Sequence, residues 1–293
     1  MFSWAKKVER AAFVDPVATF QRPDTADASG TDTHANTQTD ADDQPLRLLS
    51  FNIQTGIKTS KYRQYVTKGW KHVLPHHARQ KNLSRIADVV ANYDVVGLQE
   101  IDMGSLRSGF MNQVEFLAYA SHFPYWYAQL NRDIGPFAQH GNGLLSRREP
   151  TGLEDHKLPG FIPGRGAVVL RIPYAGDELV VVMLHLSLGE RSRRLQLDYI
   201  AEQIEHERQV VVMGDMNTPL PRLMEHTHLK RLDIAPAAPS EPTYPAWRPA
   251  LALDHILVTP NLAVNDFQVL NCRLSDHRPI AVEISARTRP AVQ

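Results

Sequence analysis

The feature of this sequence that most constrains its fold is a set of apolar runs that each end in polar residues. The runs at 46–53, 93–98, 179–184 and 210–213 are rich in Val, Leu and Ile and show almost no alternation with polar residues. Such runs are typical of strands that are buried on both faces. Polar groups at the ends of such strands tend to converge on one rim of a sheet, where functional sites are built. The polar residues that close these four runs are Asn52, Gln99, Glu100, His185, Asp215 and Asn217.

Further strands and a few helices follow from the same patterns. Helical spacing of apolar residues appears at 79–92, 111–122 and 190–206. Many strands with few helices favour two packed sheets flanked by helices over a single sheet covered by helices. The sequence predicts strands at 46–53, 94–100, 125–130, 141–147, 167–172, 179–187, 209–216, 254–259, 264–270 and 279–285.

Four carboxylates are expected in one cleft, namely Glu100, Asp215, Asp254 and Asp276. Two unit charges about 4 Å apart repel by roughly 4 kcal/mol at an effective dielectric near 20, so a cation is needed to offset them. Carboxylate and amide oxygens, without cysteine or a His-x-x-x-His pair, suit Mg²⁺ or Mn²⁺ better than zinc. Because Mg²⁺ usually binds one or two carboxylates together with substrate phosphate oxygens, the predicted chemistry is phosphate ester hydrolysis.

Seven short motifs follow one another along the chain. They are Phe51-Asn52-Ile53, Leu98-Gln99-Glu100, Gly141 to Arg147, Leu184-His185-Leu186, Gly214-Asp215-Met216-Asn217, Leu253-Asp254-His255-Ile256 and Ser275-Asp276-His277-Arg278-Pro279. In this order they resemble the motifs of the endonuclease/exonuclease/phosphatase superfamily. The resemblance covers about residues 46–285 and is nearest to small bacterial, sphingomyelinase-like members. It implies a DNase I-like α/β fold, in which two packed mixed sheets flanked by helices form a four-layer α/β/β/α sandwich.

The resemblance also implies which residues hold the metal. Glu100 would be the principal ligand, and Asn52 beside it would touch a metal-bound water or the phosphate. Asp276 would add a carboxylate that faces the metal or lies behind its ligands. The cofactor implied is Mg²⁺, with Mn²⁺ as the alternative.

Five further residues are implied as catalytic. Asp215 would orient or deprotonate the attacking water, and Asn217 would hold a phosphoryl oxygen. His277 would donate to the phosphoryl group as negative charge develops, with Asp254 fixing its tautomer. His185 would be the second imidazole, on the phosphate or leaving-group side.

Three residues are candidates for binding substrate. Arg107 and Arg165 each lie in a glycine-containing loop beyond a motif strand, and a guanidinium can fork onto two phosphate oxygens. A surface salt bridge is an equally good interpretation of each. Asn142, in the Gly-Asn-Gly strand, is expected to line the cleft.

Composition limits the substrate and the compartment. Lys plus Arg equals Asp plus Glu, with 32 of each, so no overall basic field attracts duplex DNA. Cys272 is the only cysteine, which excludes an intramolecular disulfide and gives no sign of an oxidising compartment. The sequence contains no 18-residue apolar run and no apolar signal-peptide core at its start, so we expect a cytoplasmic protein.

The first 45 residues differ from the rest. Residues 1–20 combine aromatic and basic residues that suit a short amphipathic helix. It would either pack on the domain or fray, or touch an anionic membrane surface, which would place the protein peripherally at the inner membrane. Residues 21–45 contain no Val, Ile, Leu, Met or aromatic residue and predict a disordered acidic linker. The catalytic domain is expected over 46–285, followed by a flexible tail at 286–293.

The sequence therefore predicts a Mg²⁺-dependent phosphoester hydrolase, most favourably a phosphodiesterase, in which water attacks a metal-bound phosphate in line. Neutral charge favours a phospholipid head group or a small diester as substrate. An endonuclease or exonuclease acting on DNA or RNA is the alternative within the same chemistry. A non-catalytic protein that binds a phosphorylated ligand is the alternative from another class. We expect a monomer.

Overall fold

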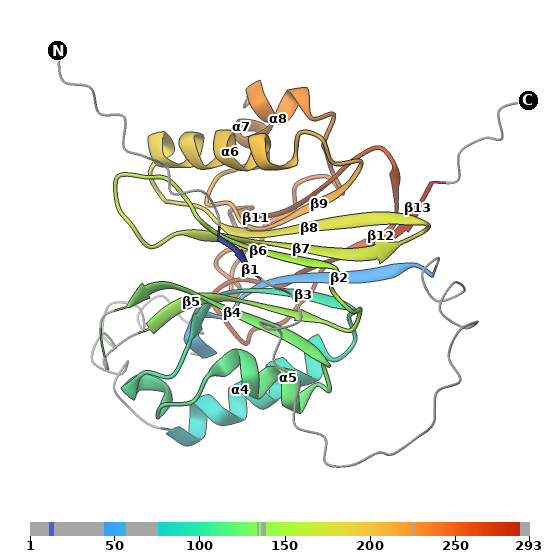
Figure 1. Ribbon diagram of the computed structural model, residues 1–293. Coiled ribbons are helices and arrows are strands. Elements are labelled where there is room, and N and C mark those ends of the chain that lie inside the picture. Colours follow the sequence, from blue (N-terminus) through green and yellow to red (C-terminus); the bar gives the residue numbers. More distant parts are fainter. Residues whose placement is uncertain are drawn as a thin grey trace, which may run out of the picture.

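Two β-sheets pack face to face at the centre of the protein, as the computed structural model shows (Figure 1). The structure describes residues 12–14, 44–56, 76–133, 135, 139–225 and 227–287, without the side chains of 12–14, 76–78, 107, 133, 227 and 230. The seven-stranded sheet has the order β1-β6-β7-β8-β9-β11-β10. Its strands are β1 (Ala12–Val14), β6 (Gly152–Lys157), β7 (Gly166–Tyr174), β8 (Asp177–His185), β9 (Gln209–Asp215), β10 (Ala235–Pro236) and β11 (Asp254–Val258).

The six-stranded sheet has the order β12-β13-β2-β3-β5-β4. Its strands are β2 (Leu46–Asn52), β3 (Val95–Asp102), β4 (Tyr125–Asp133), β5 (Gln139–Ser146), β12 (Leu262–Val269) and β13 (Ile280–Ala286). Helices α4 (His76–Val90) and α5 (Gln113–Ala120) cover its outer face. Helices α6 (Glu190–Ile204), α7 (Leu220–Met224) and α8 (Thr227–Arg231) cover the outer face of the other sheet. Two 3₁₀ turns, η1 (Gln54–Gly56) and η3 (Leu106–Ser108), follow β2 and β3.

The alternating direction of strand side chains explains the four layers. In β8, Leu179, Val181 and Met183 point into the core between the sheets. The residues between them, Val180 and Val182, pack under the helices on the other face. Both faces of the strand are buried, so its sequence can be apolar without alternation. The same division holds in β2, where Leu46 and Leu48 face the other sheet and Leu49 and Phe51 pack under the helices of the outer face.

Each sheet contains one parallel strand pair, and these pairs position the site. Helix α4 connects β2 to β3, and α6 connects β8 to β9, as parallel pairing requires. In the register of these pairs, Asn52 lies beside Gln99 and His185 lies beside Asp215. In both sheets, polar residues therefore lie at the carboxyl ends of the parallel strands.

The architecture matches the predicted two packed mixed sheets with flanking helices. All ten predicted strands and all three predicted helices are present, with bounds that differ by a few residues. The sequence patterns did not predict β6, β10, α7 or α8, which are short or carry polar residues. Among the described residues, no helix has the length and apolar character to cross a membrane.

The described part of the first 20 residues is a strand. Ala12–Val14 forms β1, which pairs antiparallel with β6, so the possible short helix within 1–20 does not include these three residues. Backbone pairing with the open edge of the seven-stranded sheet satisfies hydrogen-bonding groups that a short isolated helix would leave to water. The remainder of 1–20, nearly all of the linker at 21–45 and most of the tail at 286–293 lie outside the described residues.

The strand end at Gly214 gives a prediction about stability. Gly214 has φ = 151°, and a Cβ added there would overlap the carbonyl oxygen of Leu184 in the neighbouring strand. We expect Gly214→Ala to lower the free energy of unfolding by about 3 kcal/mol or more. Gly176→Ala is the matched control, because Gly176 also has positive φ, +71°, but its Cβ would meet nothing within 4 Å. Its cost should be about 1 kcal/mol. Denaturant unfolding of both variants measures the difference, and equal losses would contradict the role given to the close approach.

Candidate active site

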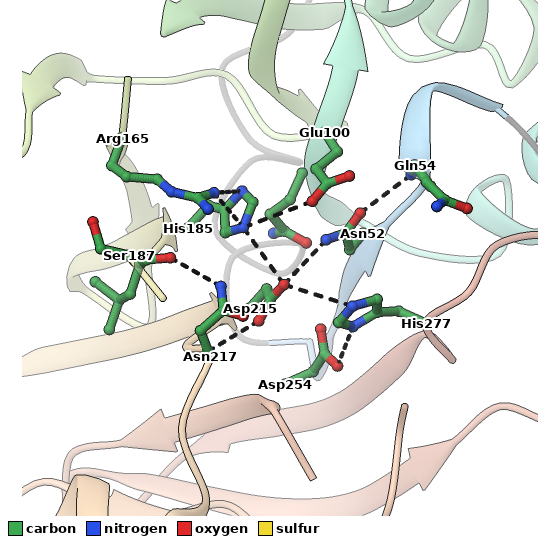
Figure 2. A network of polar contacts seen from close by, with 12 residues as sticks. Asn52, Gln54, Glu100, Arg165, His185, Ser187, Asp215, Asn217, Asp254 and His277 are labelled. Atoms are coloured by element: carbon green, nitrogen blue, oxygen red, sulfur yellow. Dashed lines mark hydrogen bonds and ion pairs between the residues drawn. The ribbon is translucent and has the colours of Figure 1, made fainter. Parts of the chain in front are cut away.

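The centre of the site is the carboxylate of Asp215 at the end of β9, which is almost fully buried. The Nδ2 group of Asn52 donates to its Oδ2 atom at 3.1 Å, from the other sheet (Figure 2). Two imidazole nitrogens face the same oxygen, His185 Nε2 at 3.5 Å and His277 Nε2 at 3.8 Å. Burial raises the pKa of Asp215 to about 7, against the opposing effect of the His277 charge. This carboxylate can therefore exchange a proton near neutral pH.

His277 is held in a fixed orientation by Asp254. Its Nδ1 atom lies 2.8 Å from Asp254 Oδ2, and the Thr243 hydroxyl donates to that same oxygen at 2.5 Å. A carboxylate can only accept here, so Nδ1 carries the proton and Nε2 faces Asp215. Burial lowers the pKa of His277, but the charges of Asp254 and Asp215 outweigh it and hold this pKa well above the usual value. The imidazole is thus a charged donor at neutral pH.

Glu100 reaches the site through an irregularity in β3. The pairing of β3 with β5 shifts register between Leu98 and Ile101, and Glu100 has φ = 55°. A bulge of this kind re-aims a side chain, and the strained backbone marks a position that the surrounding structure enforces. The Glu100 side chain is 39% exposed, and its Oε1 lies 4.0 Å from His185 Nε2. Burial and the nearby Asp276 carboxylate raise the pKa of Glu100, so the surrounding residues do not fully stabilise its negative charge.

Arg165 and His185 lie in close contact on the other side of Asp215. Arg165 Nη1 lies 2.7 Å from His185 Nδ1 and 2.5 Å from Nε2. An atom in the plane of the ring cannot reach both nitrogens, because Cε1 stands between them, so the guanidinium lies against the ring face. Burial and the Arg165 charge lower the pKa of His185 well below its usual value. Arg165 is therefore the cation of this pair, beside a neutral imidazole (Figure 2).

Asn217 links the segments at the ends of β8 and β9 through hydrogen bonds. With φ = 49°, it turns the chain after β9, and its backbone N–H donates to Asp215 Oδ1 at 3.0 Å. Its Nδ2 group donates to the Leu186 carbonyl at 2.9 Å. An amide NH₂ carries two protons, so the second remains available for another acceptor.

The donor set permits a divalent metal at this site. Carboxylate oxygens of Asp215 and Asp254 and a nitrogen of His277 lie within 4.8 Å of one another. However, His277 and Asp254 already bind each other and Thr243, so a metal among these three would break a satisfied buried network. The electrostatic arrangement at Glu100 fits a cation better, since a second carboxylate, Asp276, raises its pKa.

The three residues predicted to bind substrate do not lie together in the site. Arg165 lies in the site, whereas the side chain of Arg107, in η3, is outside what the structure describes. Asn142 is fully buried, and its Nδ2 donates to Gln129 Oε1 at 2.9 Å and to the Gly166 carbonyl at 3.1 Å. Its Oδ1 atom has no hydrogen-bond partner in the described part of the chain. Asn142 lines a cleft of about 740 Å³ that also reaches Glu100, Arg165 and His185.

The structure thus brings together nine of the eleven predicted residues around Asp215 and Glu100. Asn142 lies on the adjoining cleft wall, and the position of the Arg107 side chain is not described. Thr243 was not predicted, and no sequence signal marks it, because its role follows only from the loop that carries it to Asp254. The nine residues are Asn52, Glu100, Arg165, His185, Asp215, Asn217, Asp254, Asp276 and His277.

Comparison with known proteins is consistent with this geometry. The sequence model described as "Endonuclease/Exonuclease/phosphatase family" matches residues 49–277. Among curated protein sequences, none matches the chain. The comparisons do not single out sphingomyelinase-like members, so that part of the resemblance stays a prediction.

Three solved structures illustrate the similarity of fold. An endonuclease/exonuclease/phosphatase from Beutenbergia cavernae is 20% identical, with a TM-score of 0.66 over 85% of this chain and 73% of that one. The human nocturnin catalytic domain with bound sulfate is 17% identical, with a TM-score of 0.63 over 83% of this chain and 94% of that one. A mannosyl-6-phosphatase from Bacteroides thetaiotaomicron is 16% identical, with a TM-score of 0.57 over 82% of this chain and 99% of that one.

The contact between Asp254 and His277 gives a prediction that needs no substrate. We expect Asp254→Asn to lower the pKa of His277, because the substitution removes the nearest negative charge that stabilises the imidazolium. An NMR titration of the His277 ring measures this pKa in both proteins. Asp177→Asn, at the start of β8, is the control and should leave the titration of His277 unchanged. An unchanged pKa in Asp254→Asn would show that Asp254 does not set the charge of His277.

Proposed function

Because this chain belongs to the endonuclease/exonuclease/phosphatase family, we propose that it is a metal-dependent phosphoester hydrolase with a preference for diesters. The observation that carries the proposal is the buried Asp215 carboxylate, which Asn52 and two imidazoles contact beside a cleft containing Arg165. This arrangement places a proton acceptor, a charged donor and a guanidinium around one point. These are the groups that attack of water on a phosphate requires.

Asp215 and His277 each carry out one of the two proton transfers. Asp215, whose pKa is about 7, accepts a proton from the attacking water and holds that water in line. His277 donates from Nε2 to a phosphoryl oxygen as negative charge builds there, and Asp254 keeps the ring in the required tautomer. The different surroundings of the two side chains give them different pKa values, and on this ground Asp215 is the base and His277 is the proton donor.

Five residues are assigned to the phosphate, its leaving group or its metal. Arg165 binds a non-bridging oxygen of the phosphate, and His185 stands on the leaving-group side. Glu100, with Asn52 and Asp276 beside it, is expected to hold Mg²⁺, which when bound offsets negative charge on the phosphate. The metal-facing role of Glu100 fits its exposure, since it is the acid that opens most towards the cleft.

The cleft supports a diester over a monoester. A diester carries a second substituent on phosphorus, and a cleft of about 740 Å³ beside Arg165 offers room for one. Equal numbers of acidic and basic residues give no overall field for duplex DNA. We therefore favour a phospholipid head group or another small diester as the substrate.

Metal dependence is the first test of this proposal. Hydrolysis of bis(4-nitrophenyl) phosphate should require Mg²⁺ or Mn²⁺ and stop with EDTA. Glu100→Gln should remove most of the activity, because a neutral amide binds the cation far more weakly than a carboxylate. Glu202→Gln, at an exposed position of α6, is the matched control and should retain full activity. Full activity after metal removal would contradict the proposal.

The role of His277 is tested by a double-mutant cycle. His277→Ala should lower kcat on the same diester by about 10²- to 10³-fold with a smaller change in KM, because the donor acts on the transition state. Asp254→Asn should change kcat in the same direction. The double variant should lose less than the product of the two single losses, since the residues act as one unit. Strict additivity, or a defect in KM alone, would make His277 a binding or structural residue.

A further inference from the structure

The cleft beside Asp215 has two chemically different ends. Glu100, Arg165 and His185 line its inner end, where the phosphate would lie. Its mouth is formed by two loops, one between β6 and β7 and one between β8 and α6. These loops carry Phe161, Ile162 and Leu188. The cleft therefore leads from a polar, charged floor to an apolar rim.

The apolar residues of the rim are unusually exposed. Phe161 is 68% exposed, Ile162 is 74% and Leu188 is 75%. They are three of the four most exposed large apolar side chains within the described ranges, and all three border one cleft. Single exposed apolar residues are ordinary on a protein surface, whereas a group around one concave site marks a place for an apolar ligand.

Hydrogen bonds to α6 hold both rim loops in place. The backbone N–H of Phe161 donates to Ser192 Oγ at 3.3 Å. In the other loop, the Ser187 N–H donates to Gln196 Oε1 at 2.9 Å, and the Arg193 guanidinium donates to the Leu188 carbonyl. The exposed side chains are thus presented by anchored backbone, which reduces the entropy that a ligand must overcome on binding.

Charge complementarity identifies the other half of the ligand. Three arginines line the cleft, Arg132, Arg165 and Arg191, and they outnumber its two acids, Glu100 and Glu190. The Arg191 guanidinium carbon lies 5.5 Å from the centre of the Phe161 ring. Such an arginine can stay against an aromatic ring while it faces an anion. The site therefore suits an anionic phosphate joined to an apolar group of limited length.

We propose that this cleft is a subsite for an apolar substituent on the scissile phosphate, so that the substrates are amphiphilic phosphodiesters. The proposal rests on the proposed function and gives its substrate class. The phosphate lies at Arg165 and Asp215, and the apolar substituent extends over Ile162 and Leu188. Among small diesters, those with longer alkyl groups are then the better substrates.

A series of 4-nitrophenyl alkyl phosphates tests this, from methyl to octyl, each below the concentration at which it aggregates and in the presence of Mg²⁺. The released 4-nitrophenol reports the rate for every ester. We expect kcat/KM to rise about twofold per added methylene, on the order of 100-fold from methyl to octyl, since the rim covers one side of the chain. The double variant Ile162→Ser, Leu188→Ser should reduce the octyl-to-methyl ratio to below about tenfold. Phe161→Ser should reduce it as well.

Tyr119→Ser is the matched control, because Tyr119 is 74% exposed on α5, away from the cleft. It should keep the wild-type ratio, and thermal unfolding checks that every variant is folded. If the methyl ester is hydrolysed but the rate does not depend on chain length, the subsite is wrong and the proposed function stands. Hydrolysis of none of the esters would overturn both. A higher kcat/KM for thymidine 5′-(4-nitrophenyl) phosphate than for the octyl ester would assign the cleft to a nucleobase and overturn the apolar subsite.

Discussion

The site depends on one buried hydrogen bond between the two sheets, from Asn52 Nδ2 to Asp215 Oδ2. Asn52 ends β2 and Asp215 ends β9, so the bond fixes how the ends of the two sheets face each other. An isolated buried carboxylate would be strongly disfavoured, and the contacts of Asn52 and the two imidazoles offset that cost. The packing of Leu, Val and Ile side chains between the sheets thus determines the geometry of the polar rim.

Some of the backbone strain of the protein lies at this rim. Glu100 and Asn217 have positive φ although they are not glycine, and Gly214 lies in a region that only glycine adopts readily. Each follows or interrupts a strand that is otherwise regular. The carboxylates of Glu100 and Asp215 both approach His185 Nε2, at 4.0 Å and 3.5 Å. The geometry of the candidate site is therefore set where the sheets stop being regular.

Much of the fold and the site could be predicted from the sequence for a specific physical reason. Strands buried on both faces, such as β8 and β9, have long apolar runs, and parallel pairing brings their polar ends to one edge. Strand β6 and the edge strand β10 lack such runs, so periodicity does not reveal them. Thr243 could not be predicted either, because its contact with Asp254 depends on the path of a loop. The positions of Phe161 and Leu188 around one cleft likewise follow from two loops that are distant in sequence.

The balance of charge in the site is the remaining constraint on its chemistry. Four carboxylates, of Glu100, Asp215, Asp254 and Asp276, face two cations, Arg165 and the charged His277. The acids outnumber the bases. Burial is the main reason that the pKa values of Glu100 and Asp215 are raised, and neighbouring carboxylates raise them further. An anionic phosphate would add to the repulsion unless a divalent cation entered with it. Because Asp254 is committed to His277 and Asp215 to Asn52, Glu100 and Asp276 are the carboxylates whose repulsion such a cation would relieve. The same excess of acid, which would disfavour the binding of phosphate alone, would therefore couple the binding of the proposed phosphate substrate to the binding of a metal.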